Sequence, residues 1–247
     1  MSAEQYTNML SESGISEQSA REYELSYLSP EEADAACGYK EAGLFFPYYN
    51  LKGCRTGGRL KPEKKEGEEK KKNRARYLQA RGSSLHLYFS RERIPQILNP
   101  DETLYITEGE KKAIRLGQDL GAPVISFPGC WNWKTSGKDG LAGEWEKVPL
   151  KDRNVIFIPD SDFFLNPKVR EGGKAFCQAL FNRGARVSIT DIRDEDGERQ
   201  GVDDFLLKHG TEELKNRMDS PWWVLEKSDF SNMPRDLSNS DVEEAIT

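Results

Sequence analysis

Cysteine and histidine are scarce in this chain, which has four cysteines and two histidines among 247 residues. The cysteines form no Cys-x-x-Cys pair and lie far apart, at Cys37, Cys54, Cys130 and Cys177. A zinc ribbon needs such ligands at close spacing, so none is expected. The spacing and the lack of a signal-peptide pattern predict reduced thiols in a cytoplasmic protein.

Long hydrophobic runs are also missing. No apolar stretch approaches the roughly 20 residues that span a bilayer, so a membrane is not an expected partner. The formal net charge of −6 excludes a uniformly basic coat for nucleic acid, although a local basic patch is compatible with it. The length suits one large domain or two modest ones, and the compact apolar runs can still build a core.

The first hundred residues predict a small α+β subdomain. Helical patterns cover the chain to about residue 28 and again after Ser29-Pro30, where a cap, a proline and two acids mark a helix start. Short strands are expected at 43–49, 53–60, 77–78 and 85–89, the first two as a hairpin. The charged residues 61–76 predict a mobile loop.

From Leu104 onward, strand and helix patterns alternate, which predicts βαβ units and a parallel sheet flanked by helices. The expected strands are 104–107, 124–127, 155–158 and 186–190. The expected helices are 110–120, 167–183, 203–209 and 211–218. The fold class is therefore α/β.

Acidic residues follow three of these strands. Glu108 follows the first, Asp160-Ser161-Asp162 follows the third, and Asp191 follows the last. The carboxyl ends of parallel strands meet in one crevice, and two aspartates at i and i+2 project to the same side of an extended chain. Hard oxygen donors without histidine or cysteine suit Mg²⁺ or Mn²⁺. The alternative is turn and capping chemistry, which an isolated Asp-x-Asp favours; Glu108 on a second strand favours a shared metal site.

These residues resemble a TOPRIM domain. The resemblance rests on residues 104–113, on Trp131-Asn132-Trp133-Lys134 and on Asp160-Ser161-Asp162. TOPRIM domains occur in DnaG-type primases, topoisomerases, OLD-family nucleases and phage primase–helicases. Residues 166–170 and 201–206 add a likeness to TOPRIM-like domains of plasmid and phage replication proteins.

The resemblance implies a Rossmann-like TOPRIM core at 101–220, an N-terminal α+β primase-like subdomain at 1–100 and a tail or linker at 221–247. It implies that Glu108 is an acid/base or metal ligand and that Asp160 and Asp162 bind the metal. Asp203 or Asp204 would add a further acid, with Asp204 placed in the ligand set. The chain departs from cellular primases in lacking their cysteine-rich zinc module, and its Asp-x-Asp precedes Phe163-Phe164-Leu165 instead of a glycine-containing helix entry.

Cations and one aromatic residue complete the candidate site. Lys111 and Lys112 follow Glu108 at a helix start, where they can bind phosphate or form a solvated helix face. Trp131 can stack a base or pack on the sheet. Arginines around the hairpin are candidates for nucleotides or the nucleic-acid backbone, and they are Arg55, Arg59, Arg74 and Arg76.

The function expected from the resemblance is metal-dependent synthesis of RNA primers on single-stranded DNA in plasmid or phage replication. Nucleoside triphosphates are the expected substrates, and a replicative helicase in the same or a separate chain is the expected protein partner. Two alternatives remain open at this point. The same acids serve a metal-dependent DNA nuclease, and a non-catalytic module that binds single-stranded DNA or a helicase would keep the fold without turnover.

Overall fold

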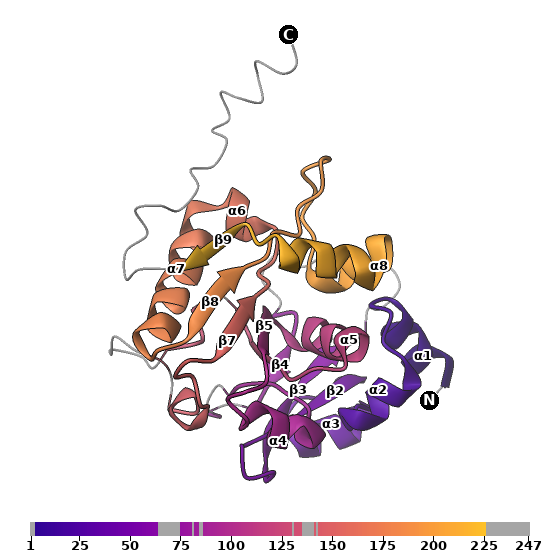
Figure 1. Cartoon of the computed structure of the whole chain (residues 1–247). Helices are drawn as coiled ribbons and strands as arrows, with labels where there is room; N and C mark the ends of the chain where they lie inside the picture. The colour runs from indigo at the N-terminus through magenta and orange to yellow at the C-terminus, as the bar shows by residue number, and fades with distance from the viewer. Residues whose placement is uncertain are drawn as a thin grey trace.

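The computed structural model describes residues 3–63, 75–80, 82–83, 86–129, 131–134, 141 and 143–225. Two sheets organise these residues, with helices packed against both (Figure 1). Most of the expected charged loop at 61–76, including Arg74, lies outside the described residues. No described helix is long and apolar enough to cross a membrane.

The N-terminal sheet is antiparallel, with strand order β1-β2-β3-β4. Its strands are β1 (Ser26–Leu28), β2 (Gly43–Tyr49), β3 (Arg55–Pro62) and β4 (Leu78–Gln79), and its helices are α1 (Ala3–Ser11), α2 (Glu17–Glu22) and α3 (Pro30–Cys37). The expected hairpin is β2 and β3, which pair Phe46 with Arg59. Gly58 has to lack a side chain, because a Cβ there would lie 2.1 Å from Cζ of Phe45.

The second sheet has the order β6-β5-β7-β8-β9 and is parallel except for its last strand. Its strands are β5 (Leu104–Glu108), β6 (Val124–Phe127), β7 (Asn154–Phe157), β8 (Arg186–Ile189) and β9 (Trp223–Leu225). The expected α/β class and the four expected parallel strands are confirmed. Residues 223–225, assigned to the tail from the sequence, form the antiparallel edge strand.

Helices cover both faces of the second sheet. Helices α6 (Asp162–Leu165) and α7 (Pro167–Asn182) lie on one side, and α5 (Glu110–Leu120) and α8 (Val202–Asp219) lie on the other (Figure 1). Successive side chains of β5 point to opposite faces of the sheet, so Ile106 packs on the α7 side and Tyr105 on the α5 side. Helix α8 is kinked at Gly210, where φ is 78°, which accounts for the two short helices expected there.

The two sheets share a core through α5. Leu44, Phe46 and Tyr48 of β2 belong to the same buried cluster as Ala113 and Ile114 of α5. Each fully buried Leu or Phe contributes about 1.5–3 kcal/mol. This packing fixes the hairpin of the first sheet beside the carboxyl edge of the second.

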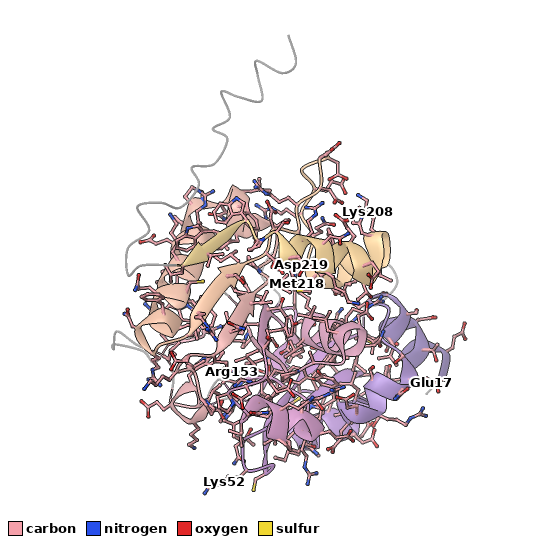
Figure 2. The ribbon with its side chains drawn as sticks, in the orientation of Figure 1. Glu17, Lys52, Arg153, Lys208, Met218 and Asp219 are labelled. Carbon is pink, nitrogen blue, oxygen red and sulfur yellow. The ribbon has the colours of Figure 1, made fainter. Side chains whose placement is uncertain are left out.

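The amino edge of the second sheet is closed by Arg153, which is completely buried just before β7 (Figure 2). Its guanidinium donates to four backbone carbonyls at 2.6–3.2 Å, those of Gln96, Ile97, Glu102 and Pro149. Burial lowers its pKa to about 10. These bonds tie the turn of α4 (Ile94–Ile97), which follows the 3-10 turn η1 (Arg91–Arg93), to the start of β7.

Candidate metal and nucleotide site

Four acids gather at the carboxyl edge of the second sheet, each placed by a different element. Glu108 is the last residue of β5, and Asp160 follows β7, whose pairing continues in a 2.8 Å bond from Ile158 N to the Ile106 carbonyl. Asp162 opens α6, and Asp203 lies in the first turn of α8. The structure therefore brings Glu108, Asp160 and Asp162 to one edge, together with Asp203 of the two residues considered for a further acid.

The pKa shifts of Glu108 and Asp160 show that the charges at this edge act on one another. Burial is the main cause that raises the pKa of Glu108 to about 8; Asp160 and Asp162 also raise this pKa, and Lys112 lowers it. The pKa of Asp160 is raised mainly by burial, against the influence of Lys112. A carboxyl poised near pH 8 can exchange a proton at physiological pH, which is the property required of a general base or acid.

Lys112 supplies the positive charge at this edge. It projects from the first turn of α5, and its Nζ donates to Oδ2 of Asp160. Burial works against the ammonium charge, but Asp160, Asp203 and Glu108 outweigh burial and raise the pKa of Lys112. The lysine is therefore charged and embedded among the acids.

The acids fit a magnesium-like ion by donor chemistry. Oδ1 of Asp160 and Oδ1 of Asp203 are buried without a hydrogen-bond partner, so each keeps an oxygen free to accept a cation. Within the described part of the chain, no three Asp, Glu, His or Cys side chains form a ready-made ligand group. Mg²⁺ commonly takes one or two carboxylates and completes its shell with waters and substrate phosphates, which this arrangement allows.

The fourth acid is Asp203, although the resemblance places Asp204 in the ligand set. Asp204 is exposed and its Oδ2 accepts a 3.2 Å bond from Gly201 N, which is the third-position role of a capping box. Asp203 is only 7% exposed, and its charge raises the pKa values of Lys112 and Asp160. The capping pattern at Gly201 is the signal that distinguishes the two aspartates in the sequence.

Two of the expected nucleotide-binding cations have internal partners. Nη1 of Arg59 lies 2.6 Å from Oε1 of Glu110, which also accepts a 2.6 Å bond from the Tyr48 hydroxyl. Lys111 is 5% exposed and donates a 2.7 Å bond to the Met9 carbonyl. In this structure Arg59 joins the hairpin to the start of α5, and Lys111 joins α5 to α1.

Three other candidates face solvent. Arg55 and Arg76 are exposed, with the Arg55 guanidinium 5.1 Å from the ring centre of Phe45. Trp131 is 39% exposed and lies just beyond β6, with Nζ of Lys134 4.7 Å from its ring centre. Trp133, two residues on, is buried in the core. The structure thus separates a packing tryptophan from one that is accessible.

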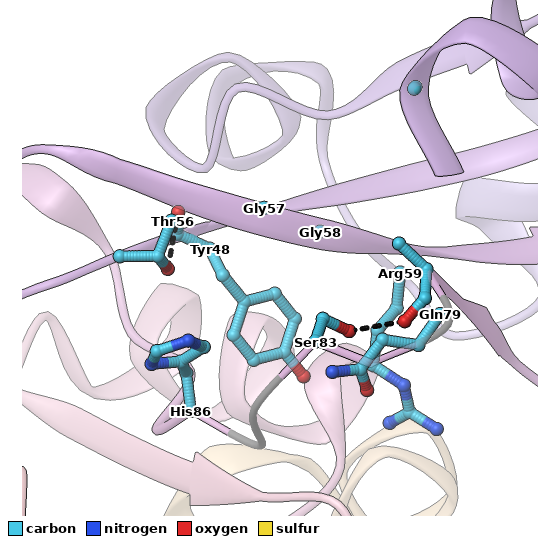
Figure 3. Close-up of a pocket in the computed structure, with 10 residues that line it drawn as sticks. Tyr48, Thr56, Gly57, Gly58, Arg59, Gln79, Ser83 and His86 are labelled. Carbon is cyan, nitrogen blue, oxygen red and sulfur yellow. Dashed lines mark hydrogen bonds between the residues drawn. The ribbon is translucent and has the colours of Figure 1, made fainter. Parts of the chain in front are cut away.

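A pocket beside β3 brings Arg59 together with other residues that the Sequence analysis does not propose as binding residues (Figure 3). It is lined by Tyr48, Thr56, Gly57, Gly58, Arg59, Gln79, Ser83 and His86, together with two alanines. Nδ1 of His86 lies 3.0 Å from Oε1 of Glu144, which fixes the ring. Two consecutive glycines in a strand are the available sequence signal, because they indicate close approach to the backbone.

Comparison with known proteins places this geometry among primase folds. A family model described as a domain of unknown function, DUF3854, matches residues 94–213. No curated protein matches the chain. Among solved structures, the zinc-binding and RNA polymerase domains of the Aquifex aeolicus primase are 15% identical to this chain, with a TM-score of 0.58. The match covers 87% of this chain and 55% of that one.

Two further structures agree. The DnaG primase catalytic domain bound to single-stranded DNA has 14% identity and a TM-score of 0.63, covering 92% of this chain and 74% of that one. The primase fragment of the bacteriophage T7 primase-helicase has 14% identity and a TM-score of 0.51, covering 85% and 73%. At this identity the likeness is one of fold: the chain has the mixed α/β fold of DnaG-type primase catalytic cores.

Proposed function

We propose that this protein is a TOPRIM-type primase core that joins ribonucleotides on a single-stranded DNA template during plasmid or phage replication. The observation that carries the proposal is the coupled set of Glu108, Asp160 and Asp162 at the carboxyl edge of a sheet with a primase-core fold. Open α/β sheets bind ligands at this edge. The proposal includes an N-terminal subdomain at 1–100 and a TOPRIM core at 101–220, to whose sheet β9 adds the edge strand. The rest of 221–247 is the tail or linker.

Each acid has a role in this proposal. Asp160 and Asp162 would hold Mg²⁺ or Mn²⁺, with Asp203 as the additional acid. When bound, the divalent ion would offset the negative charge of the triphosphate. Glu108, whose pKa is about 8, accepts the proton of the attacking hydroxyl. Buried oxygens that are already in place contribute because they need no reorganisation during the reaction.

Positive and aromatic groups at the rim hold the nucleic acid. Arg55 and Arg76 are exposed near the hairpin and can contact phosphates, while Trp131 can stack an unpaired base. Lys112 lies beside the acids, where it can reach a triphosphate. A replicative helicase, in the same or another chain, would deliver the template.

The test is primer synthesis with single-stranded DNA, labelled nucleoside triphosphates and Mn²⁺. The wild-type protein is expected to make oligoribonucleotides and Asp160→Ala to make none. Asp196→Ala is the matched control, because it removes a carboxylate from an exposed pair with Lys208. Nicking of plasmid without nucleotides, lost in Glu108→Ala, would instead assign a nuclease. No turnover of either kind by the wild-type protein would contradict both assignments.

A further inference from the structure

Lys112 occupies one of the two carboxylate oxygens of Asp160. Its ammonium donates to Oδ2 of Asp160, and the charges of Glu108 and Asp203 also act on it. The contact is made at one oxygen only, since Oδ1 of Asp160 has no partner. The lysine therefore offsets negative charge at Asp160 but leaves Oδ1 of this residue without a hydrogen-bond partner.

The fold provides a place for this lysine. Gly201, at the N-cap of α8, leaves open the space that the lysine stem fills: a Cβ there would lie 2.4 Å from Cε of Lys112 and 2.8 Å from Oδ1 of Asp203. The backbone has φ −98° at Gly201, which other residues can adopt, so crowding rather than conformation disfavours a side chain. Asp203 is nine-tenths buried, and its unpartnered Oδ1 lies beside this path.

The ion pair between Arg193 and Asp191 is more firmly held than the contact between Lys112 and Asp160. Arg193 binds Asp191, after β8, through Nε and Nη2 at 2.7–3.1 Å, using both carboxylate oxygens. Its guanidinium also lies 4.5 Å from the ring centre of Phe164. A fork of this kind is geometrically fixed, whereas a lysine is a point charge on a flexible stem. Lys112 can leave Asp160 by rotating its stem.

We propose that Lys112 is a tethered counter-cation, which a divalent ion displaces from Asp160 and whose freed ammonium then binds a phosphate of the nucleotide. The inference rests on the proposed function for the existence of the metal centre. It goes further in making Lys112 a switch: without metal the ammonium is held by Asp160, and with metal it is released toward the substrate. Metal and triphosphate would then strengthen each other's binding, as linkage requires.

The experiment is a titration with Mn²⁺ at pH 8, followed by the electron paramagnetic resonance of free Mn²⁺, without and with a non-hydrolysable nucleoside triphosphate. Lys112→Met is expected to bind Mn²⁺ about tenfold more tightly than the wild-type protein when no nucleotide is present. It should also lose part of the increase in Mn²⁺ affinity that the nucleotide causes. Lys215→Met, which removes an exposed lysine paired with Glu212, is the control for net charge and should match the wild-type protein.

A second variant separates charge from packing. Lys112→Arg keeps the cation and is expected to keep wild-type or weaker Mn²⁺ binding. If Lys112→Met binds Mn²⁺ no more tightly than the wild-type protein, or if Lys112→Arg tightens binding equally, the tethered-cation role is wrong while the metal centre stands. If neither the wild-type protein nor Lys112→Met binds Mn²⁺, the metal centre of the proposed function is itself wrong.

Discussion

Both edges of the second sheet bury charged groups, but the two edges differ in whether these groups have hydrogen-bond partners. At the amino edge, Arg153 is completely buried and all of its nitrogens donate to backbone carbonyls. At the carboxyl edge, Asp160 and Asp203 keep buried oxygens that have no partner. A buried polar group that lacks a partner costs roughly 1–3 kcal/mol.

The difference indicates which edge is built for stability and which for a ligand. A satisfied buried charge fixes the elements around it and has no capacity left for a further partner. An unsatisfied one lowers stability until a cation arrives. The carboxyl edge is thus the part of the sheet where removing a charged group should reduce function more than folding.

The largest expected effect is on the carboxyl edge. Asp160→Asn should reduce primer synthesis by at least about 10²-fold, because it removes a charged ligand. It should leave the melting temperature nearly unchanged, because the amide oxygen can still accept a hydrogen bond from Lys112 while one of the mutually repelling carboxylates is lost. Primer yield and thermal melting measured on the same preparation check this. A large fall in melting temperature would mean that Asp160 is structural.

The amino edge should respond in the reverse manner. Arg153→Leu is expected to lower the free energy of unfolding by about 3 kcal/mol, because four carbonyls lose their donor. Urea denaturation measures this. Arg186→Leu is the control, since the side chain of Arg186 donates an exposed bond to the Asp152 carbonyl and its loss should cost at most about 0.5 kcal/mol. Equal costs for the two variants would remove the distinction.

Changing pH should affect the carboxyl edge through Glu108, whose pKa rises from 4.5 to about 8 on folding. The folded state holds this proton more tightly than the unfolded state. The stability that this carboxyl contributes is therefore complete below about pH 4.5 and is lost as pH rises through 8. Metal binding requires the proton to leave, so Mg²⁺ affinity should rise as pH approaches 8.

Calorimetric titration of Mg²⁺ between pH 6 and 9 measures this dependence. Glu108→Gln, which cannot titrate, should bind Mg²⁺ weakly and with a flatter pH profile. If the wild-type protein has the same Mg²⁺ affinity at pH 6 and pH 9, the raised pKa of Glu108 is not linked to the metal.

The smallest expected effect concerns the rim. Arg76→Ala and Trp131→Ala should each weaken single-stranded DNA binding by about 1 kcal/mol, with the salt dependence reduced only in Arg76→Ala. Lys111→Met should leave DNA affinity unchanged, because its ammonium is held by the Met9 carbonyl. Fluorescence anisotropy at several salt concentrations compares the three. A loss of DNA affinity in Lys111→Met as large as in Arg76→Ala would show that α1 moves aside on binding.

The parallel sheet and its acidic edge were accessible from the sequence because they depend on local patterns. Apolar runs of four or five residues predict β5, β6, β7 and β8, and acids follow three of these strands, β5, β7 and β8. The roles of Arg59 and Lys111 were not accessible, because their partners Glu110 and Met9 lie 51 and 102 residues away in the chain. Asp203 and Asp204 are adjacent in the sequence, and the capping bond from Gly201 N to Asp204 is what distinguishes their roles.

A metal centre at the carboxyl edge of the second sheet can be tested directly with a crystal soaked in Mn²⁺ and measured at a wavelength where manganese scatters anomalously. A metal centre shared by these acids predicts one strong anomalous peak within coordination distance of Asp160 and Asp162, near Glu108, with the ammonium of Lys112 moved off Asp160. An absence of anomalous density at this edge, with Lys112 still bound to Asp160 at saturating Mn²⁺, would contradict it.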